Sequence, residues 1–413
     1  MSKDSDGEAI MEPTLNYKTI LEDLVGEKAF QYISRARELA SMGFDVISFG
    51  VGQPDIPTPQ FLVDEGKKVL DERFTGYTET EGIKELRSAV AEYLNTRYRS
   101  DVRPEEVVIT VGTKGAAYLA MAAYVRPGDE IIVTDPTYPV YSELPKFLGA
   151  RPVYAPLRWL GEESGFSLDI DSINELITSK TKGIAIVNPH NPTGAVFSSK
   201  EVEELMNLAR DYNLLVVADE IYDNFLYDDA DFKSFISFPD WREHVLYCNG
   251  FSKTFSMTGW RLGYLVARHE VTKVLTKLAV NTWSCPPSIA QKVGIRALKS
   301  DWSFVREMVS LFDRRRKTLC RELRQIKWFE VWCGKGAFYL FPRVSKILEA
   351  TGLDVETFVT SLIEKKHVVT LPGTAFPKEF GKDFVRFSYA ISEEKIVEGV
   401  KRIREFVEEI TSK

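Results

Sequence analysis

The sequence is poor in cysteine, and this bounds the metal and disulfide chemistry that it can support. Only four of its 413 residues are cysteines: Cys248, Cys285, Cys320 and Cys333. They form no CxxC pair, and no histidine stands at a spacing typical of a metal site. We therefore expect no metal site, and we expect free thiols in a reducing compartment rather than disulfides.

The chain also lacks the patterns of membrane, nucleic-acid and dinucleotide binding. No apolar run approaches the ~20 residues that a helix needs to span a bilayer. The formal net charge is -7, whereas phosphate backbones select basic surfaces. The phosphate-binding P-loop GxxxxGK[ST] is absent. GVGQPD is not the dinucleotide-binding motif GxGxxG, because it lacks the third glycine and does not open a helix. We expect no membrane and no nucleic-acid partner.

The first residues, MSKDSDGEAIMEP, are polar and acidic, which is the opposite of a secretory signal. They predict a disordered tail over residues 1–13 and a cytoplasmic protein.

What the sequence does contain is a series of short apolar segments, each followed by polar residues. Six of them are typical of buried strands: EVVIT (106–110), EIIVTD (130–135), GIAIVN (183–188), LLVVAD (214–219), HVLYCNG (244–250) and LGYLVA (262–267). Amphipathic stretches lie between several of them, such as SSKEVEELMNLARDYN, where Ser198 or Ser199 is a suitable helix cap. This alternation predicts an α/β fold with a mostly parallel sheet, and such sheets bind ligands at the carboxyl ends of their strands.

The two ends of the chain follow another pattern. Residues from about 14 to 45 are helix-like, and the charge density rises from about residue 300, before the short strands GAFYLFP and DFVRFSYA. We predict a large α/β domain over residues 60–300 and a smaller α+β domain formed by residues 14–59 and 301–413.

The polar clusters after the strands would meet in one crevice. After the first strand come Gly112, Thr113 and Lys114, which either present helix N–H groups to an anion or form an ordinary turn. After the second strand comes Tyr138, whose ring either lies flat against a planar ligand or packs into the core. After the third comes Asn191 of PHNPTG, whose backbone is restricted by the following proline in what is otherwise a simple turn.

The fourth strand ends at Asp219, where a carboxylate without a partner is costly. It is either a helix cap or an acid that holds a protonated nitrogen, and the phenol of Tyr222 follows three residues later.

The stretch SKTFSMTGWR then brings Lys253 to the same edge. A partly desolvated lysine near another cation has a lowered pKa and becomes a nucleophile. Arg261 offers a planar fork to a phosphate, and Ser252 offers a hydroxyl. In isolation these residues are somewhat more typical of a polar surface loop than of a site. Together with a stacking ring and an acid for a ring nitrogen, they indicate pyridoxal 5′-phosphate (PLP).

SKTFSMTGWRLGY, NPHNPTG, ADEIYDNF and GQPDIPTP resemble the class I aminotransferases of PLP fold type I, from about residue 30 to 410. The archaeal and thermophilic-type aspartate aminotransferases are the most similar. The resemblance implies that Lys253 binds the PLP aldehyde covalently and carries the proton of the reaction. It also implies a ring-binding set and a phosphate-binding set. The ring set is Tyr138, Asn191, Asp219 and Tyr222, and the phosphate set is Gly112, Thr113, Lys114, Ser252 and Arg261.

The resemblance further implies a homodimer with shared sites, because Tyr77 of GYTETEGIKELR matches a residue that reaches the neighbouring subunit's phosphate. Arg386 matches the arginine that binds the substrate α-carboxylate, and Gly52 and Asn191 lie at the same place. Gly250 departs from the pattern, since many relatives have serine there. This departure puts the affinity for the cofactor in question.

The resemblance implies transfer of an amino group from L-aspartate to 2-oxoglutarate, giving oxaloacetate and L-glutamate. Lys114 is the candidate cation for the side-chain carboxylate. Alternatives are an aromatic or broad-specificity aminotransferase, a PLP-dependent carbon–sulfur lyase, and a PLP-binding transcription regulator. The regulator is disfavoured because only about 60 residues precede the predicted large domain, and Gly52 belongs to them.

Overall fold

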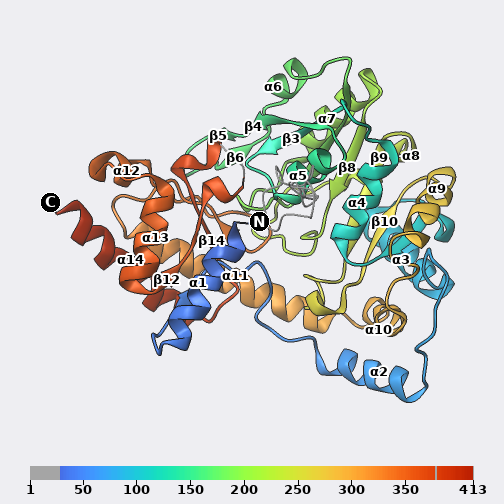
Figure 1. The fold of residues 1–413 in the computed structure, drawn as a ribbon, viewed down its shortest axis with the longest axis horizontal. Helices are drawn as coiled ribbons and strands as arrows, with labels where there is room; N and C mark the ends of the chain where they lie inside the picture. The colour runs from blue at the N-terminus through green and yellow to red at the C-terminus, as the bar shows by residue number, and fades with distance from the viewer. Residues whose placement is uncertain (1–27, 377–378, 413) are drawn as a thin grey trace, which may run out of the picture.

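A seven-stranded sheet forms the centre of the computed structural model, which describes residues 28–376 and 379–412 (Figure 1). The predicted tail over residues 1–13 lies outside the described residues. The strand order is β2-β10-β9-β8-β7-β3-β4. The bounds are β2 Val107–Thr110, β3 Glu130–Asp135, β4 Arg151–Pro156, β7 Thr181–Val187, β8 Leu215–Asp219, β9 Val245–Gly250 and β10 Gly263–Val266. Only β10 is antiparallel to its neighbours in this sheet, so the predicted, mostly parallel sheet is confirmed.

All six predicted strands belong to this sheet, and β4 is the strand that the sequence did not indicate. Its segment RPVYAP carries prolines at both ends of a mixed burial pattern. Proline removes a backbone donor and is tolerated at a sheet edge, where β4 lies.

Helices cover both faces of the sheet, because alternate strand residues point into two separate cores. Val108 packs with helices α4 Thr113–Tyr124, α5 Val140–Phe147 and α9 His269–Val280. Its neighbour Ile109 packs on the opposite face, with another set of helices. That set is α3 Lys84–Tyr98, α6 Ile170–Glu175, α7 Ser199–Asp211, α8 Trp241–His244 and α10 Ser288–Leu298. The short strands β5 Arg158–Trp159 and β6 Phe166–Ser167 form a separate hairpin.

The sequence left two candidates for the cap of α7, and the structure selects Ser198. Its Oγ accepts a hydrogen bond from Glu201 N at 3.3 Å, and the Glu201 carboxylate accepts one from Ser198 N at 2.7 Å. Two backbone donors of the helix start are therefore satisfied reciprocally.

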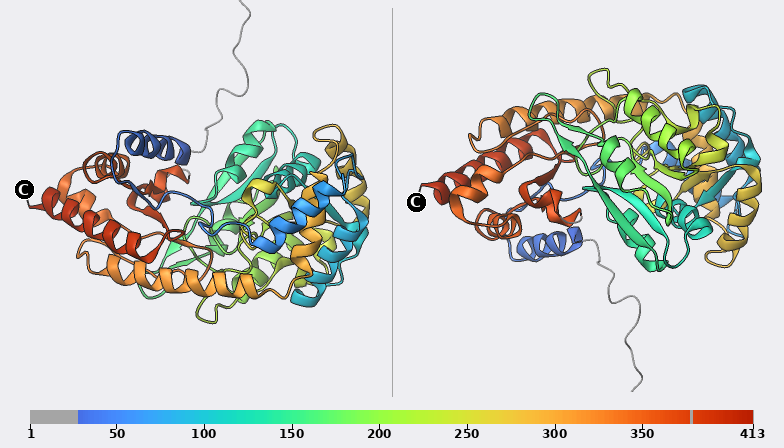
Figure 2. Two further views of the ribbon diagram at one scale, coloured as in Figure 1. Left: turned by 90° about the horizontal axis from the view of Figure 1, so that it is seen from below. Right: turned by 90° about the horizontal axis from the view of Figure 1, so that it is seen from above.

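The N-terminal and C-terminal segments pack together beside the large sheet (Figures 1 and 2). The parallel pair β1 Ile47–Ser48 and β12 Val368–Val369 joins them directly. The other elements there are α1 Ala29–Ser41, α11 Ser303–Arg324, β11 Tyr339–Leu340, α12 Ser345–Thr351, α13 Val355–Lys366, β13 Leu371–Pro372, β14 Val385–Ser388 and α14 Glu393–Thr411. Helix α2 Gln60–Asp71 packs instead against α10. We keep the domain boundaries near residues 60 and 300 as a proposal. Among the described residues, no helix combines the length and apolarity needed to cross a bilayer.

The expectation of free thiols is wrong for two of the four cysteines. Cys320 on α11 and Cys333 before β11 form a disulfide, with their Cα atoms 5.8 Å apart. The chain turns back along α11 after the helix ends, so two cysteines 13 residues apart meet. Cys248 and Cys285 are free.

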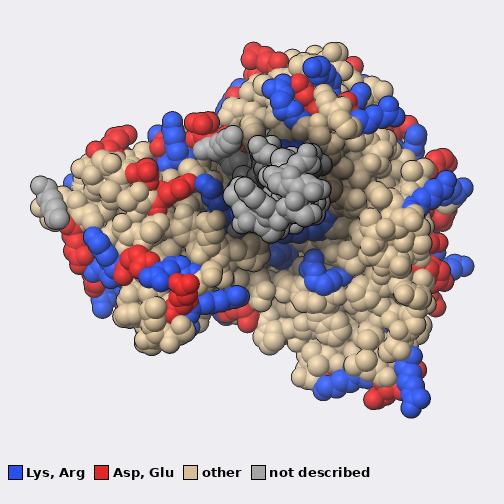
Figure 3. Space-filling view, viewed as in Figure 1, with Lys and Arg blue, Asp and Glu red and all other residues tan. Residues whose placement is uncertain are grey.

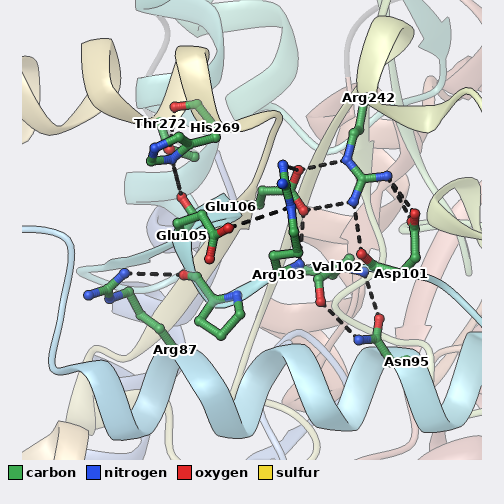
Figure 4. Close-up of polar contacts among 11 residues, drawn as sticks. Arg87, Asn95, Asp101, Val102, Arg103, Glu105, Glu106, Arg242, His269 and Thr272 are labelled. Atoms are coloured by element: carbon green, nitrogen blue, oxygen red, sulfur yellow. Dashed lines mark hydrogen bonds and ion pairs between the residues drawn. The ribbon is translucent and has the colours of Figure 1, made fainter.

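A buried carboxylate holds the start of β2, the strand that leads to Thr113 (Figure 4). Glu106 accepts hydrogen bonds from Arg242 Nε at 2.6 Å and from Arg103 Nη2 at 2.9 Å. Arg242 also binds Asp101, so α8 is tied to the loop before β2. Burial alone would raise the pKa of Glu106, but the two arginines outweigh burial and hold this pKa below its usual range.

Candidate functional site

One cavity of about 300 Å³ gathers the polar residues that follow the central strands. Every predicted site residue lines it except Gly112 and Tyr77. Those that line it are Gly52, Thr113, Lys114, Tyr138, Asn191, Asp219, Tyr222, Ser252, Lys253, Arg261 and Arg386. On the face of the molecule seen in Figure 3, acidic and basic side chains are mixed around the periphery. The cavity differs from that outer surface, because several cations line it together: Lys114, Lys253, Arg261 and Arg386.

Lys253 follows β9, and its Nζ donates a hydrogen bond to the Gly52 carbonyl oxygen at 2.6 Å. Burial lowers the pKa of this amine to about 8, and the positive charge of Arg386 acts in the same direction. A larger fraction of the amine is therefore neutral near pH 7 than for an ordinary lysine, as a nucleophile or base requires.

Asp219 ends β8 at the cavity, and donors satisfy both of its carboxylate oxygens. Tyr141 Oη donates to Oδ2 at 2.6 Å, and Ile221 N donates to Oδ1 at 3.0 Å. Burial raises the pKa of Asp219 to about 6, while these hydrogen bonds and the charge of Lys253 oppose the rise. The carboxylate is thus mostly ionised near pH 7 and suited to hold a protonated nitrogen.

The start of α4 forms an anion-binding corner. Gly112 precedes the helix with φ at 74°, and an added Cβ would lie 2.5 Å from Arg261 Nη2, so only glycine is suitable there. The Thr113 hydroxyl is buried and has no hydrogen-bond partner among the described residues. A buried hydroxyl, the backbone N–H groups of a helix start and a guanidinium together fit a phosphate.

Arg386 lies on β14, and its side chain lines the same cavity. Its Nη1 donates to Asn191 Oδ1 at 3.1 Å, and its Nη2 donates to the Gly50 carbonyl oxygen at 2.7 Å. The guanidinium lies 4.5 Å from the Tyr339 ring centre and 4.7 Å from that of Phe376. Such a buried, oriented guanidinium is suited to a carboxylate.

The structure adds cavity residues that the sequence reasoning missed. Besides its ring contact with Arg386, Tyr339 lies 2.7 Å from Tyr222, oxygen to oxygen. Tyr339 stands in GAFYLFP, a segment that predicted a strand and gave no indication of a binding or catalytic role. Tyr141 gave a weak signal, because it follows Tyr138 by three residues in the segment PTYPVY after the same strand.

A Cβ on Gly250 would lie 2.9 Å from both Gly263 Cα and Thr113 Oγ1, so the strand pair leaves little room for a serine. The Tyr77 side chain is 90% exposed and does not line the cavity of its own chain.

The fold is shared with a solved aminotransferase structure. The aspartate aminotransferase from Thermus thermophilus with maleate has a TM-score of 0.88 and 31% identity, covering 95% of this chain and 99% of that chain. The fold therefore defines a PLP-dependent transferase of fold type I, as predicted.

Two sequence relatives and a family model agree with this class. The aspartate aminotransferase of Sulfurisphaera tokodaii is 46% identical over 397 residues, covering 96% of this chain and 98% of that protein. That of Sulfolobus acidocaldarius is 45% identical over 386 residues, covering 93% and 96%. The family model described as aminotransferase class I and II matches residues 45–403. This chain belongs to the class I and II aminotransferase family, and the prediction of an aminotransferase is confirmed.

Proposed function

We propose that this aminotransferase binds PLP in the described cavity and transfers the amino group of L-aspartate to 2-oxoglutarate. The observation that carries the proposal is the cavity itself, where Lys253 with its lowered pKa stands between an anion corner and a buried guanidinium. Bound PLP supplies an electron-withdrawing ring that stabilises negative charge on the substrate's α-carbon. The remaining work belongs to the side chains of the cavity.

The residues present fit the phosphate of PLP. The N–H groups at the start of α4, the buried Thr113 hydroxyl, Ser252 and Arg261 would surround it. Its ring would lie against Tyr138, with Asp219 at the ring nitrogen. The phenolic oxygen of PLP would lie near Tyr222 and Asn191, both of which line the cavity.

Lys253 is the residue that moves the proton. Its amine, with a pKa near 8, can take a proton from the substrate's α-carbon and later release it. Arg386 would hold the α-carboxylate, assisted by Asn191 and by the backbone at Gly52. Binding of the α-carboxylate would orient the bond between the α-carbon and the hydrogen that is removed.

The choice of aspartate rests on Lys114 and on the relatives. Both aspartate and 2-oxoglutarate carry a second carboxylate, which needs a cation in the cavity. Lys114 lines the cavity, with its Nζ 5.6 Å from the Tyr138 ring centre. Relatives at 45–46% identity are aspartate aminotransferases, which supports the same donor here.

We also propose a cytoplasmic homodimer with shared sites. The resemblance of GYTETEGIKELR to the family's motif supports the dimer, and the 90% exposed side chain of Tyr77 is accessible to a partner chain. In the dimer Tyr77 would complete the phosphate site of the neighbouring subunit.

The test combines a cofactor titration with an amino-donor screen. Apo-protein titrated with PLP should gain a visible absorbance band, and Lys253→Ala should lose both this band and turnover. With 2-oxoglutarate as acceptor, Lys114→Ala should lower kcat/KM for aspartate about tenfold or more, since a charged hydrogen bond is lost, and change it little for alanine.

Lys84→Ala is the matched control, because this exposed lysine also stands at the start of a helix and does not line the cavity. A protein that PLP leaves colourless would refute the cofactor. Unchanged aspartate efficiency in Lys114→Ala, with reduced activity toward aromatic donors, would favour the aromatic alternative.

A further inference from the structure

The carboxylate of Asp219 is held by two donors from different parts of the chain. Tyr141 Oη, from the first turn of α5, donates to Oδ2 at 2.6 Å, and Ile221 N donates to Oδ1 at 3.0 Å. Tyr141 is fully buried, and Asp219 is 4% exposed. Because the donors bind different oxygens, they fix the rotation of the carboxylate. Its remaining lone pairs are available to a ligand in the cavity, which both side chains line.

We propose that Tyr141 is a positioning residue that holds the Asp219 carboxylate in the orientation needed to bind a protonated ring nitrogen. This inference rests on the proposed function, because the basic ring nitrogen of PLP is what gives the carboxylate this task. Tyr141 acts through Asp219 and need not touch the cofactor.

Helix α5 links this interaction to the ring-stacking position. Tyr141 N donates to the Tyr138 carbonyl oxygen at 3.0 Å, and the two rings meet edge to face with centroids 6.5 Å apart. One helix start therefore sets both the ring surface and the donor to the acid. A shift of α5 would disturb both together.

The charges around Asp219 agree with a donor role for Tyr141. The titratable groups that act on the carboxylate are Lys253, Tyr141, Asp223 and Cys248. Burial and the Asp219 charge raise the pKa of the Tyr141 phenol well above its usual value, so the phenol keeps its proton. Because its hydrogen bond opposes the burial-induced rise in the pKa of Asp219, its loss would leave Asp219 less ionised near pH 7.

The experiment compares two ligands of the apo-protein by calorimetry at pH 7. One is PLP, and the other is the PLP analogue in which carbon replaces the ring nitrogen. Tyr141→Phe removes one oxygen atom and keeps the ring. It should weaken PLP binding about tenfold, the usual scale for a hydrogen bond to a charged group, while analogue binding changes little.

A double-mutant cycle with Asp219→Asn separates positioning from general stability. In the Asp219→Asn background, Tyr141→Phe should have no further effect on the ratio of the two affinities. Tyr227→Phe is the matched control, because Tyr227 is also buried and its hydroxyl donates to the Ala337 carbonyl oxygen at 2.8 Å. This control should leave the ratio unchanged, and thermal melts should show how each variant is folded.

The outcomes distinguish this inference from the proposed function. If the wild-type apo-protein binds neither ligand, the proposed function is wrong. If it binds PLP and Tyr141→Phe lowers both affinities equally, or neither, then Tyr141 does not act through Asp219 and the inference alone fails.

Discussion

Gly250 shows how one missing carbon atom can shape the cavity. It pairs directly with Gly263 across β9 and β10, and an added Cβ would lie 2.9 Å from Gly263 Cα and from Thr113 Oγ1. Real Cβ contacts are longer, so the strands or the threonine must shift. We predict that Gly250→Ser lowers the free energy of unfolding by about 1–3 kcal/mol, the usual cost of overpacking, and weakens PLP binding. Chemical denaturation and PLP titration measure the two effects.

Gly250→Ala separates crowding from hydrogen bonding, because it adds the Cβ without the hydroxyl. Both variants should be similarly destabilised. If Gly250→Ser were as stable as the wild type and bound PLP more tightly than Gly250→Ala, the crowding argument would be wrong. The serine of many relatives would then be compatible with this strand pair.

Strand β2 depends on the ion-pair cluster at its start, because this cluster fixes the strand that ends beside the anion corner (Figure 4). Glu106→Gln keeps the size of the side chain and removes its charge, leaving Arg242 and Arg103 with a weaker acceptor. We predict a loss of about 1–3 kcal/mol in the free energy of unfolding at pH 7, the usual value for hydrogen bonds to charged groups. Glu105→Gln is the control, because Glu105 is only partly buried and its ion pair with Arg103 is longer, at 3.6 Å.

The effect of Glu106→Gln should depend on pH in a definite direction. The pKa of Glu106 is lower in the folded protein than in the unfolded chain, because Arg242 and Arg103 outweigh its burial. Its contribution is therefore complete above the unfolded pKa, about 4.3, and is lost as the pH falls through the folded pKa. Denaturation curves of wild type and variant should differ at pH 7 and converge in acid. A constant difference would contradict this account.

Six of the seven strands of the large sheet were predictable because each is an almost wholly apolar run that polar residues follow. The same polar residues gave most of the cavity, since parallel strands bring their carboxyl ends together. Tyr339 was not predictable, because it comes from the C-terminal segment and reaches the cavity only through tertiary packing. The Cys320–Cys333 pair was missed for a similar reason, as the return of the chain along α11 leaves no local pattern.

At the scale of the whole molecule, Tyr77 lies on the surface and away from the cavity of its own chain. Tyr77 is 90% exposed, although it belongs to a segment that resembles the family's phosphate-binding motif. Its own cavity is lined without it. In a homodimer with two-fold symmetry each subunit would give Tyr77 to the other, so each site would need residues from both chains.

This arrangement predicts that two defective proteins restore activity when they share a dimer. In a hybrid of a Lys253→Ala subunit and a Tyr77→Ala subunit, one site carries both changes and the other carries neither. With free exchange at equal amounts, about half of the dimers are hybrids, so activity should reach about a quarter of the wild-type value. The assay uses PLP too dilute to saturate the Tyr77→Ala homodimer, and unmixed proteins serve as controls. Activity no greater than the mean of the unmixed proteins, with hybrids confirmed by mass, would show that each chain builds its own site.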